Sequence, residues 1–177
     1  MTDAPFVDGW IARLAASRRD GACALDVAMG RGRHTLPLAR AGFRTFGVDI
    51  RHDAVRDAAI AAGAEDCVLR VWCADLTRCP LPRSRFDLIV VARYLQRDLS
   101  GALQAALRPG GTLLYETFTT AQRAHGCGPT SPEHLLDRGE LARAFPDLET
   151  LFYEEVLEPS AVARLVARKR ALRFNAS

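Results

Sequence analysis

Lysine and long apolar runs are scarce in this sequence of 177 residues. Lys169 is the only lysine, so arginine supplies almost all of the 24 basic residues that stand against 21 acidic ones. The arginines are scattered and form no basic stripe suited to a nucleic-acid backbone. The longest aliphatic run, residues 88–92, is far shorter than the about 20 residues of a membrane-spanning helix, and the first residues show no signal-peptide pattern. We therefore expect a cytoplasmic protein that neither enters a membrane nor binds nucleic acid.

Paired cysteines are also missing. The five cysteines include no Cys-x-x-Cys pair and no Cys/His cluster with zinc-ligand spacing. We expect free thiols and no bound metal. With 49% hydrophobic and 25% charged residues the composition is that of a globular protein, and the length predicts a single domain over residues 1–177.

Short apolar runs alternate with amphipathic stretches, which indicates a parallel sheet with helices on both faces. Strands are predicted at residues 23–28, 45–49, 67–72, 86–91 and 112–116, and helices at 4–18 (in an N-terminal segment 1–20), 35–41, 53–62, 99–107 and 138–145. Two last strands, 149–157 and 161–169, are joined by so few residues that they must be antiparallel. The predicted fold is α/β and doubly wound: a mostly parallel, seven-stranded sheet with an antiparallel C-terminal hairpin.

A glycine turn follows the first predicted strand. Gly30 and Gly32 form this turn, and Asp49 ends the second strand about 20 residues later. In doubly wound sheets such glycines let the backbone approach a nucleotide, while the acid accepts hydrogen bonds from the ribose. A nicotinamide-binding turn would need a third glycine where this chain has Thr35. An NAD-binding domain is therefore the less favoured interpretation.

The same turn resembles the acidic-x-Gly-x-Gly-x-Gly loop of class I S-adenosylmethionine-dependent methyltransferases, with Ala28 at the first glycine position. The resemblance extends over roughly residues 22–170 and includes the family's fourth strand at 86–91 and its turn into the fifth strand at 108–114. It implies a Rossmann-like fold and S-adenosylmethionine as cofactor. The residues that it assigns to the cofactor are Asp26, Ala28, Gly30, Gly32, Asp49, Ile50, Asp75 and Leu76.

A narrower resemblance links the sequence to small bacterial methyltransferases of the tellurite-resistance type. It is carried by LDVAMGRGRH at 25–34, the pair Tyr94-Leu95, YETF at 115–118 and LLDRGEL at 135–141. Two positions depart from the pattern: Met29 stands where these relatives often have cysteine, and Arg93 where a smaller polar residue is common.

Candidates for acceptor chemistry follow the fourth and fifth predicted strands, because ligands of open parallel sheets bind beyond the carboxyl ends of the strands. They are Arg93, Tyr94, Glu116 and His125, with no single catalytic residue assigned. Arg93 would either bind an anionic acceptor or pair with Asp98, and Glu116 would either face the site or form an ion pair. The segment 117–136 is long enough to be a substrate lid.

The acceptor is expected to be a small molecule. The Pro-Pro loop that methyltransferases of exocyclic base amines carry after the fourth strand is replaced here by Ala92-Arg93-Tyr94-Leu95. The alternative is a non-catalytic S-adenosylmethionine-binding module or partner subunit, since no substrate-cap domain is inserted in the chain. No sequence motif specifies an oligomeric state.

Overall fold

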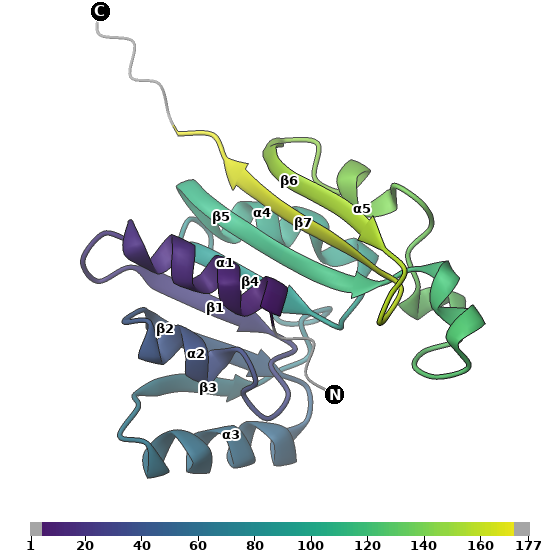
Figure 1. Ribbon diagram of the computed structural model, residues 1–177. Coiled ribbons are helices and arrows are strands. Elements are labelled where there is room, and N and C mark those ends of the chain that lie inside the picture. The colour runs from purple at the N-terminus through teal and green to yellow at the C-terminus, as the bar shows by residue number, and fades with distance from the viewer. Residues whose placement is uncertain (1–4, 172–177) are drawn as a thin grey trace, which may run out of the picture.

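A seven-stranded mixed sheet forms the centre of the computed structural model, which describes residues 5–171 (Figure 1). The strand order is β3-β2-β1-β4-β5-β7-β6. The strands are β1 Cys23–Val27, β2 Arg44–Asp49, β3 Leu69–Cys73, β4 Phe86–Ala92, β5 Leu107–Phe118, β6 Leu148–Val156 and β7 Val162–Lys169. The predicted fold class is confirmed, including the antiparallel placement of β7 between β5 and β6.

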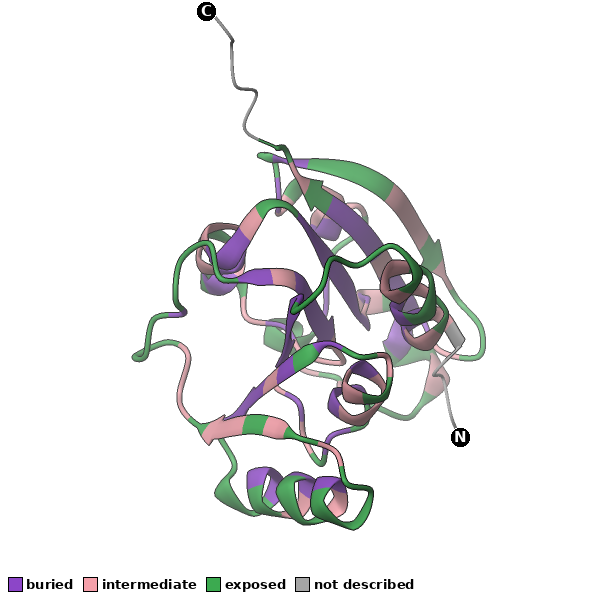
Figure 2. Ribbon diagram, turned by 90° about the vertical axis from the view of Figure 1, so that its left-hand side faces the viewer, coloured by how far each residue is buried: buried purple, intermediate pink, exposed green. Residues whose placement is uncertain are grey.

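Helices cover both faces of the sheet. We call the face covered by α1 (Pro5–Ala16), α2 (Thr35–Arg40) and α3 (His52–Ala64) the α1 face, and the face covered by α4 (Ser100–Ala106) and α5 (Glu140–Arg143) the α4 face (Figures 1 and 2). Short 3-10 helices occupy Arg97–Leu99, Thr120–His125 and Pro132–His134. Residues 1–4 of the predicted N-terminal segment and residues 172–177 of the predicted domain lie outside the described residues. None of the described helices is long and apolar enough to span a bilayer.

The core has two apolar layers because the central strands β1 and β4 are buried on both faces. All five residues of β1 are buried, and β4 is an almost continuous apolar run with partners on both sides. Strands of this kind need apolar layers on both of their faces. Leu25 and Ile89 belong to the layer under α4 and α5, whereas Ala24 and Val90 belong to the layer under α1 and α2.

The connection between β3 and β4 differs from the other parallel crossovers. Residues 74–85, all described, contain no helix, so this part of the α4 face is not covered by one. Phe46 of β2 lies there, and the guanidinium carbons of Arg44, Arg70 and Arg85 are 5.7, 5.8 and 5.7 Å from its ring centroid. Arginine side chains can cover apolar surface in this way while their charged ends stay in water.

Several predicted boundaries move in the structure. The helix predicted at 99–107 is a 3-10 turn followed by α4, which ends at Ala106. Strand β5 then begins at Leu107 rather than at 112, and its register with β4 shifts between Phe86 and Leu88. The segment 117–136 holds the end of β5 and the 3-10 helices Thr120–His125 and Pro132–His134. The predicted helix 138–145 is only the single turn of α5.

Candidate functional site

A cavity of about 380 Å³ opens where the carboxyl ends of β1, β2, β3 and β4 meet. Its lining residues are Ala28, Val48, Asp49, Ile50, Ala74, Asp75, Leu76, Thr77, Tyr94 and Gln96. The strand order reverses between β1 and β4, and ligands of open α/β sheets bind at such a switch point. The cavity, hereafter the β1–β4 cavity, thus brings together five of the residues assigned to the cofactor and one catalytic candidate, Tyr94.

The turn after β1 is built from left-handed backbone conformations. Ala28, Gly30 and Gly32 have φ angles of 54°, 54° and 88°. A side chain on Gly32 would lie 3.3 Å from Cβ of Ala58 in α3, so this glycine also allows α3 to pack closely. Ala28 adopts the conformation that a glycine would hold more easily, because a left-handed alanine costs about 1–2 kcal/mol.

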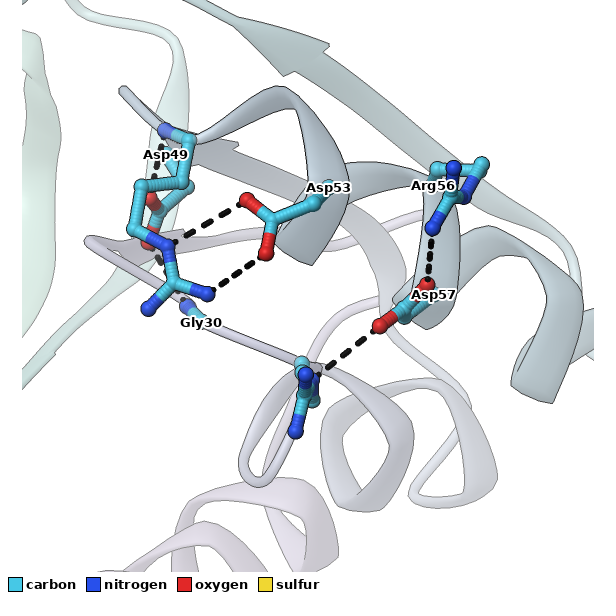
Figure 3. A network of polar contacts seen from close by, with 7 residues as sticks. Gly30, Asp49, Asp53, Arg56 and Asp57 are labelled. Atoms are coloured by element: carbon cyan, nitrogen blue, oxygen red, sulfur yellow. Dashed lines mark hydrogen bonds and ion pairs between the residues drawn. The ribbon is translucent and has the colours of Figure 1, made fainter.

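Asp49 fixes the position of this turn. Its Oδ2 accepts a hydrogen bond from the backbone N–H of Gly30 at 2.8 Å, and its Oδ1 accepts one from the N–H of Arg51 at 2.8 Å (Figure 3). Arg51 in turn pairs with Asp53 at the start of α3. Each carboxylate oxygen has a second lone pair, so Asp49 can hold the turn and still accept hydrogen bonds from a ligand.

Asp75 lies in the loop after β3. Its Oδ1 accepts hydrogen bonds from the backbone N–H of Thr77 at 2.9 Å and from the Thr77 hydroxyl at 2.7 Å. These two hydrogen bonds hold the pKa of the Asp75 carboxyl below its usual range, so the group is ionised at neutral pH. Thr77 and Gln96 line the β1–β4 cavity but were not predicted, although each follows a predicted residue within two positions.

Asp26 does not line the cavity. It is buried beneath the start of α2, where its Oδ2 accepts a hydrogen bond from the Thr35 hydroxyl at 2.6 Å. Burial raises the pKa of Asp26 to about 7, against the opposing effect of the Thr35 hydrogen bonds. Thr35, the residue that breaks the nicotinamide pattern, is therefore the partner of the acid that begins the loop.

Met29 lies in the core rather than in the cavity. Its sulfur packs against Gly47 of β2 so closely that a side chain at Gly47 would collide with it. Met29 also belongs to a small apolar cluster with Val55 and Ala58 of α3. Met29, which stands where methyltransferases of the tellurite-resistance type often have cysteine, therefore packs between the turn and α3.

Arg93 and Glu116 belong to an ion-pair network rather than to the cavity lining. Glu116 is 2% exposed, and its Oε2 lies 2.7 Å from Nε of Arg164, which also pairs with Glu154 at 3.0 Å. Nε of Arg93 lies 3.8 Å from Oε1 of Glu116, and its guanidinium stacks 4.5 Å from the Phe118 ring centroid. Of the alternatives considered above, Glu116 is thus ion-paired, and Arg93 lies beside Glu116.

Asp98 has a different partner from the one weighed for it. It accepts a hydrogen bond from Nε2 of Gln96 at 2.6 Å. Arg164 was not predicted as a partner of Glu116 because the pair depends on the register of β5 against β7, where the two residues face each other. Only the long-range pairing of these strands reveals the network.

His125 ends the 3-10 helix Thr120–His125 and does not line the β1–β4 cavity. In the same helix Gln122 is buried and unpredicted: its Oε1 accepts a hydrogen bond from the N–H of Ala161 at 2.7 Å, and its Nε2 donates to the carbonyl of Cys127 at 3.0 Å. Within residues 5–171 no cluster of three His, Cys, Asp or Glu side chains is arranged to hold a metal.

Comparison with known proteins supports the fold. Residues 24–111 match the family model of the methyltransferase domain. No curated protein matches the sequence. Among solved structures, TehB from Haemophilus influenzae is similar with a TM-score of 0.75 at 18% identity, and the alignment covers 92% of this chain and 62% of TehB.

Two further structures extend the comparison. An S-adenosylmethionine-dependent methyltransferase from Aquifex aeolicus gives a TM-score of 0.72 at 18% identity, covering 94% of this chain and 93% of that protein. The 4+2 cyclase SpnF gives 0.77 at 16% identity, covering 94% of this chain and 80% of SpnF. At sequence identities this low, the similarity shows a shared fold.

The fold, the turn after β1 and the family match define an α/β methyltransferase domain. The fold is that of the class I S-adenosylmethionine-dependent methyltransferases, and S-adenosylmethionine is the cofactor that the family match implies. The narrower resemblance, to small bacterial methyltransferases of the tellurite-resistance type, is matched among solved structures by TehB.

Proposed function

We propose that this protein transfers the methyl group of S-adenosylmethionine to a small-molecule acceptor in the cytoplasm. The observation that carries the proposal is the convergence of the glycine turn, Asp49 and Asp75 on the β1–β4 cavity. In this proposal the backbone of residues 28–32 approaches the methionine part, Asp49 accepts hydrogen bonds from the ribose, and Asp75 lies beside the adenine. Ile50 and Leu76 provide the apolar walls.

The residues present suit such a ligand. The turn exposes backbone rather than bulky side chains, two carboxylates offer hydrogen-bond acceptors, and aliphatic side chains line the remainder of the cavity. Asp26 supports the turn from below and would attract the ammonium group through water. The bound cofactor supplies an electrophilic methyl group. The residues of the chain would align this methyl group with the acceptor and exclude water.

The first experiment is calorimetric titration with S-adenosylmethionine, S-adenosylhomocysteine and NAD in parallel. We expect micromolar binding of the first two and none of NAD. Replacing Asp49 with Ala removes hydrogen bonds to a charged group, each worth about 1.5–3 kcal/mol, and should weaken S-adenosylmethionine binding at least tenfold.

Asp53→Ala is the matched control, because Asp53 pairs with Arg51 at the surface and does not line the cavity. Its S-adenosylmethionine affinity should stay within twofold of the wild type. An Asp49→Ala variant that folds and binds with unchanged affinity would refute the ribose assignment. Binding of NAD in place of the other two ligands would revive the NAD-binding interpretation.

The second candidate function is a binding module without turnover. The SpnF comparison favours keeping it, since a protein described as a cyclase shares this fold. Formation of S-adenosylhomocysteine from a panel of thiols, oxyanions, phenols and amines would exclude the module. Tight cofactor binding with no turnover across the panel would support it. The segment 117–136 remains our proposal for the substrate lid.

A further inference from the structure

A second cavity lies on the α4 face, between α4 and α5. It measures about 270 Å³. Its walls are mainly apolar and include Leu95, Leu103, Leu136, Leu141 and Phe145, each at most 9% exposed. Apolar cavities of about 150 Å³ can hold a benzene molecule, and ligand pockets start at about 300 Å³, so this space suits a single ring with one small substituent.

The cavity between α4 and α5, hereafter the α4–α5 cavity, adjoins the β1–β4 cavity at one short segment of chain. Gln96 lines both cavities, Tyr94 lines the β1–β4 cavity, and Leu95 lines the α4–α5 cavity. This segment follows β4 at the switch point of the sheet, where the proposed cofactor site lies. Gln96 therefore faces both a molecule in the α4–α5 cavity and the proposed methyl donor, and the two sites adjoin at this residue.

Polar side chains also line the cavity and limit what it can accept: Gln96, Arg97, Ser100, Tyr115, Glu140 and Arg143. Oε1 of Glu140 lies 2.6 Å from Nε of Arg97, and this ion pair lowers the pKa of Glu140. Tyr115 is buried, and burial raises the pKa of its hydroxyl, which therefore stays protonated. Arg143, which donates a hydrogen bond to the carbonyl of Arg138, adds a further positive charge.

These groups offer no general base. A carboxylate paired with arginine is a weak proton acceptor, the tyrosine is neutral, and no histidine lines the cavity. A nucleophile that reacts from this position must already be ionised at neutral pH. An aromatic thiol satisfies this condition and fits the apolar walls, whereas an aliphatic alcohol or a protonated amine does not.

We propose that the α4–α5 cavity is the acceptor site and that it takes a ring-sized aromatic thiol; this inference rests on the proposed methyltransferase function. The thiol loses its proton to water on ionising. A lone pair of the thiolate sulfur then forms a bond to the methyl carbon while the bond from that carbon to the sulfonium breaks. An aryl methyl thioether and S-adenosylhomocysteine leave.

Thiophenol is the probe acceptor, and Ala144→Leu is the variant that fills the cavity. Ala144 follows α5 and lines the cavity, so three added carbon atoms leave too little space for a ring. Thiophenol should be methylated faster than selenite or free cysteine at equal concentration. Ala144→Leu should lower kcat/KM for thiophenol at least tenfold and leave S-adenosylmethionine affinity within twofold. Ser100→Leu fills the cavity from α4 and guards against a variant that fails to fold.

The control is Ala59→Leu, the same change at an exposed position of α3. It should leave both thiophenol turnover and cofactor affinity unchanged. Faster turnover of selenite or cysteine, or unchanged thiophenol turnover in both filled variants, would overturn the proposal.

Binding of thioanisole, which cannot react, separates this proposal from the methyltransferase function itself. Calorimetry should detect thioanisole binding to the wild type and to Ala59→Leu, and its loss in Ala144→Leu and Ser100→Leu. If S-adenosylmethionine fails to bind while thioanisole binds in this pattern, the cavity assignment as a ring-binding site holds and the methyltransferase function fails. If thioanisole does not bind the wild type, the assignment of the acceptor site is wrong, whether or not S-adenosylmethionine binds.

Discussion

Ala28 is the single residue at which the turn after β1 departs most clearly from the glycine-rich pattern. Its φ of 54° is the left-handed conformation, which costs an alanine about 1–2 kcal/mol. Glycine avoids that cost but loses about 0.5–1 kcal/mol of chain entropy. We expect Ala28→Gly to raise the free energy of unfolding by about 0.5–1 kcal/mol and Tm by about 1–4 °C, measured by thermal and urea unfolding.

The comparison for this prediction is Ala59→Gly, in the middle of α3 on its exposed side. There the backbone is helical, so glycine should destabilise the protein by about 1 kcal/mol. A rise in the free energy of unfolding for Ala28→Gly together with a fall for Ala59→Gly would support strain at Ala28. A destabilised Ala28→Gly variant would mean that contacts of the alanine methyl group outweigh the strain.

Some residues of the candidate site could be predicted from the sequence, and others could not. Asp49 is the last residue of β2 and Asp75 lies two residues after the end of β3, so strand order alone brings them to one cavity. The pairs Asp26–Thr35 and Glu116–Arg164 depend on side-chain direction and on pairing across the sheet. A one-dimensional pattern contains neither of these, and Arg164 was therefore missed.

At the scale of elements, strands were easier to predict than the segments between them. The short, mainly apolar runs of β1 and β4 are typical of strands that are buried on both faces. The start of β5 was wrong because residues 109–111, which read as a turn, continue the strand through a shift in register. The segment 117–136 has too few apolar residues to reveal that Gln122 anchors it in the core.

Gln122 tests how much of the proposed lid can move. Its side chain joins the 3-10 helix Thr120–His125 to the N–H of Ala161 and to the carbonyl of Cys127. Gln122→Ala leaves the buried N–H of Ala161 without this partner, at a cost of about 1–3 kcal/mol, and also removes the hydrogen bond to Cys127. We expect the amide of Ala161 and the amides of 119–128 to exchange hydrogen at least tenfold faster, while those of β1 and β4 stay unchanged.

Arg123→Ala is the matched change in the same helix, because Arg123 is exposed and donates a hydrogen bond to the carbonyl of Thr130. It should accelerate exchange near residue 130 and leave Ala161 protected. If Gln122→Ala exchanges like the wild type, the isolated bridge between Thr119 and Leu136 holds the segment instead, and any lid motion is limited to the residues between them.

For the whole molecule, the two faces of the sheet carry different chemistry. Neighbouring residues of a strand point to opposite faces, so Tyr115 belongs to the apolar layer under α4 and α5 while Glu116 pairs with Arg164. The α1 face holds buried ionisable groups, and the α4 face holds the apolar cavity. The β1–β4 cavity lies at the ends of the strands, within reach of both faces. This arrangement allows an apolar acceptor and a charged cofactor to meet at one edge of the sheet.

Buried ionisable groups on the α1 face make the stability of the whole domain depend on pH. Burial raises the pKa of Asp26 to about 7, whereas in the unfolded chain it should be about 3.9. Between these values the folded protein binds the proton more tightly than the unfolded chain. The contribution of Asp26 to stability therefore falls as pH rises from about 4 to about 7, and the loss is complete above that range.

Asp26→Asn removes this titration while keeping an oxygen that can accept from Thr35. Its gain in unfolding free energy over the wild type should grow from near zero at pH 4 to about 1–4 kcal/mol at pH 8, at about 1.4 kcal/mol per pKa unit, measured by urea unfolding across the range. His34, whose pKa burial lowers, titrates in both proteins, so the difference between them isolates Asp26. A difference that does not vary with pH would mean that the Thr35 hydrogen bonds keep Asp26 ionised in the folded protein throughout, and that the turn after β1 rests on a buried charge.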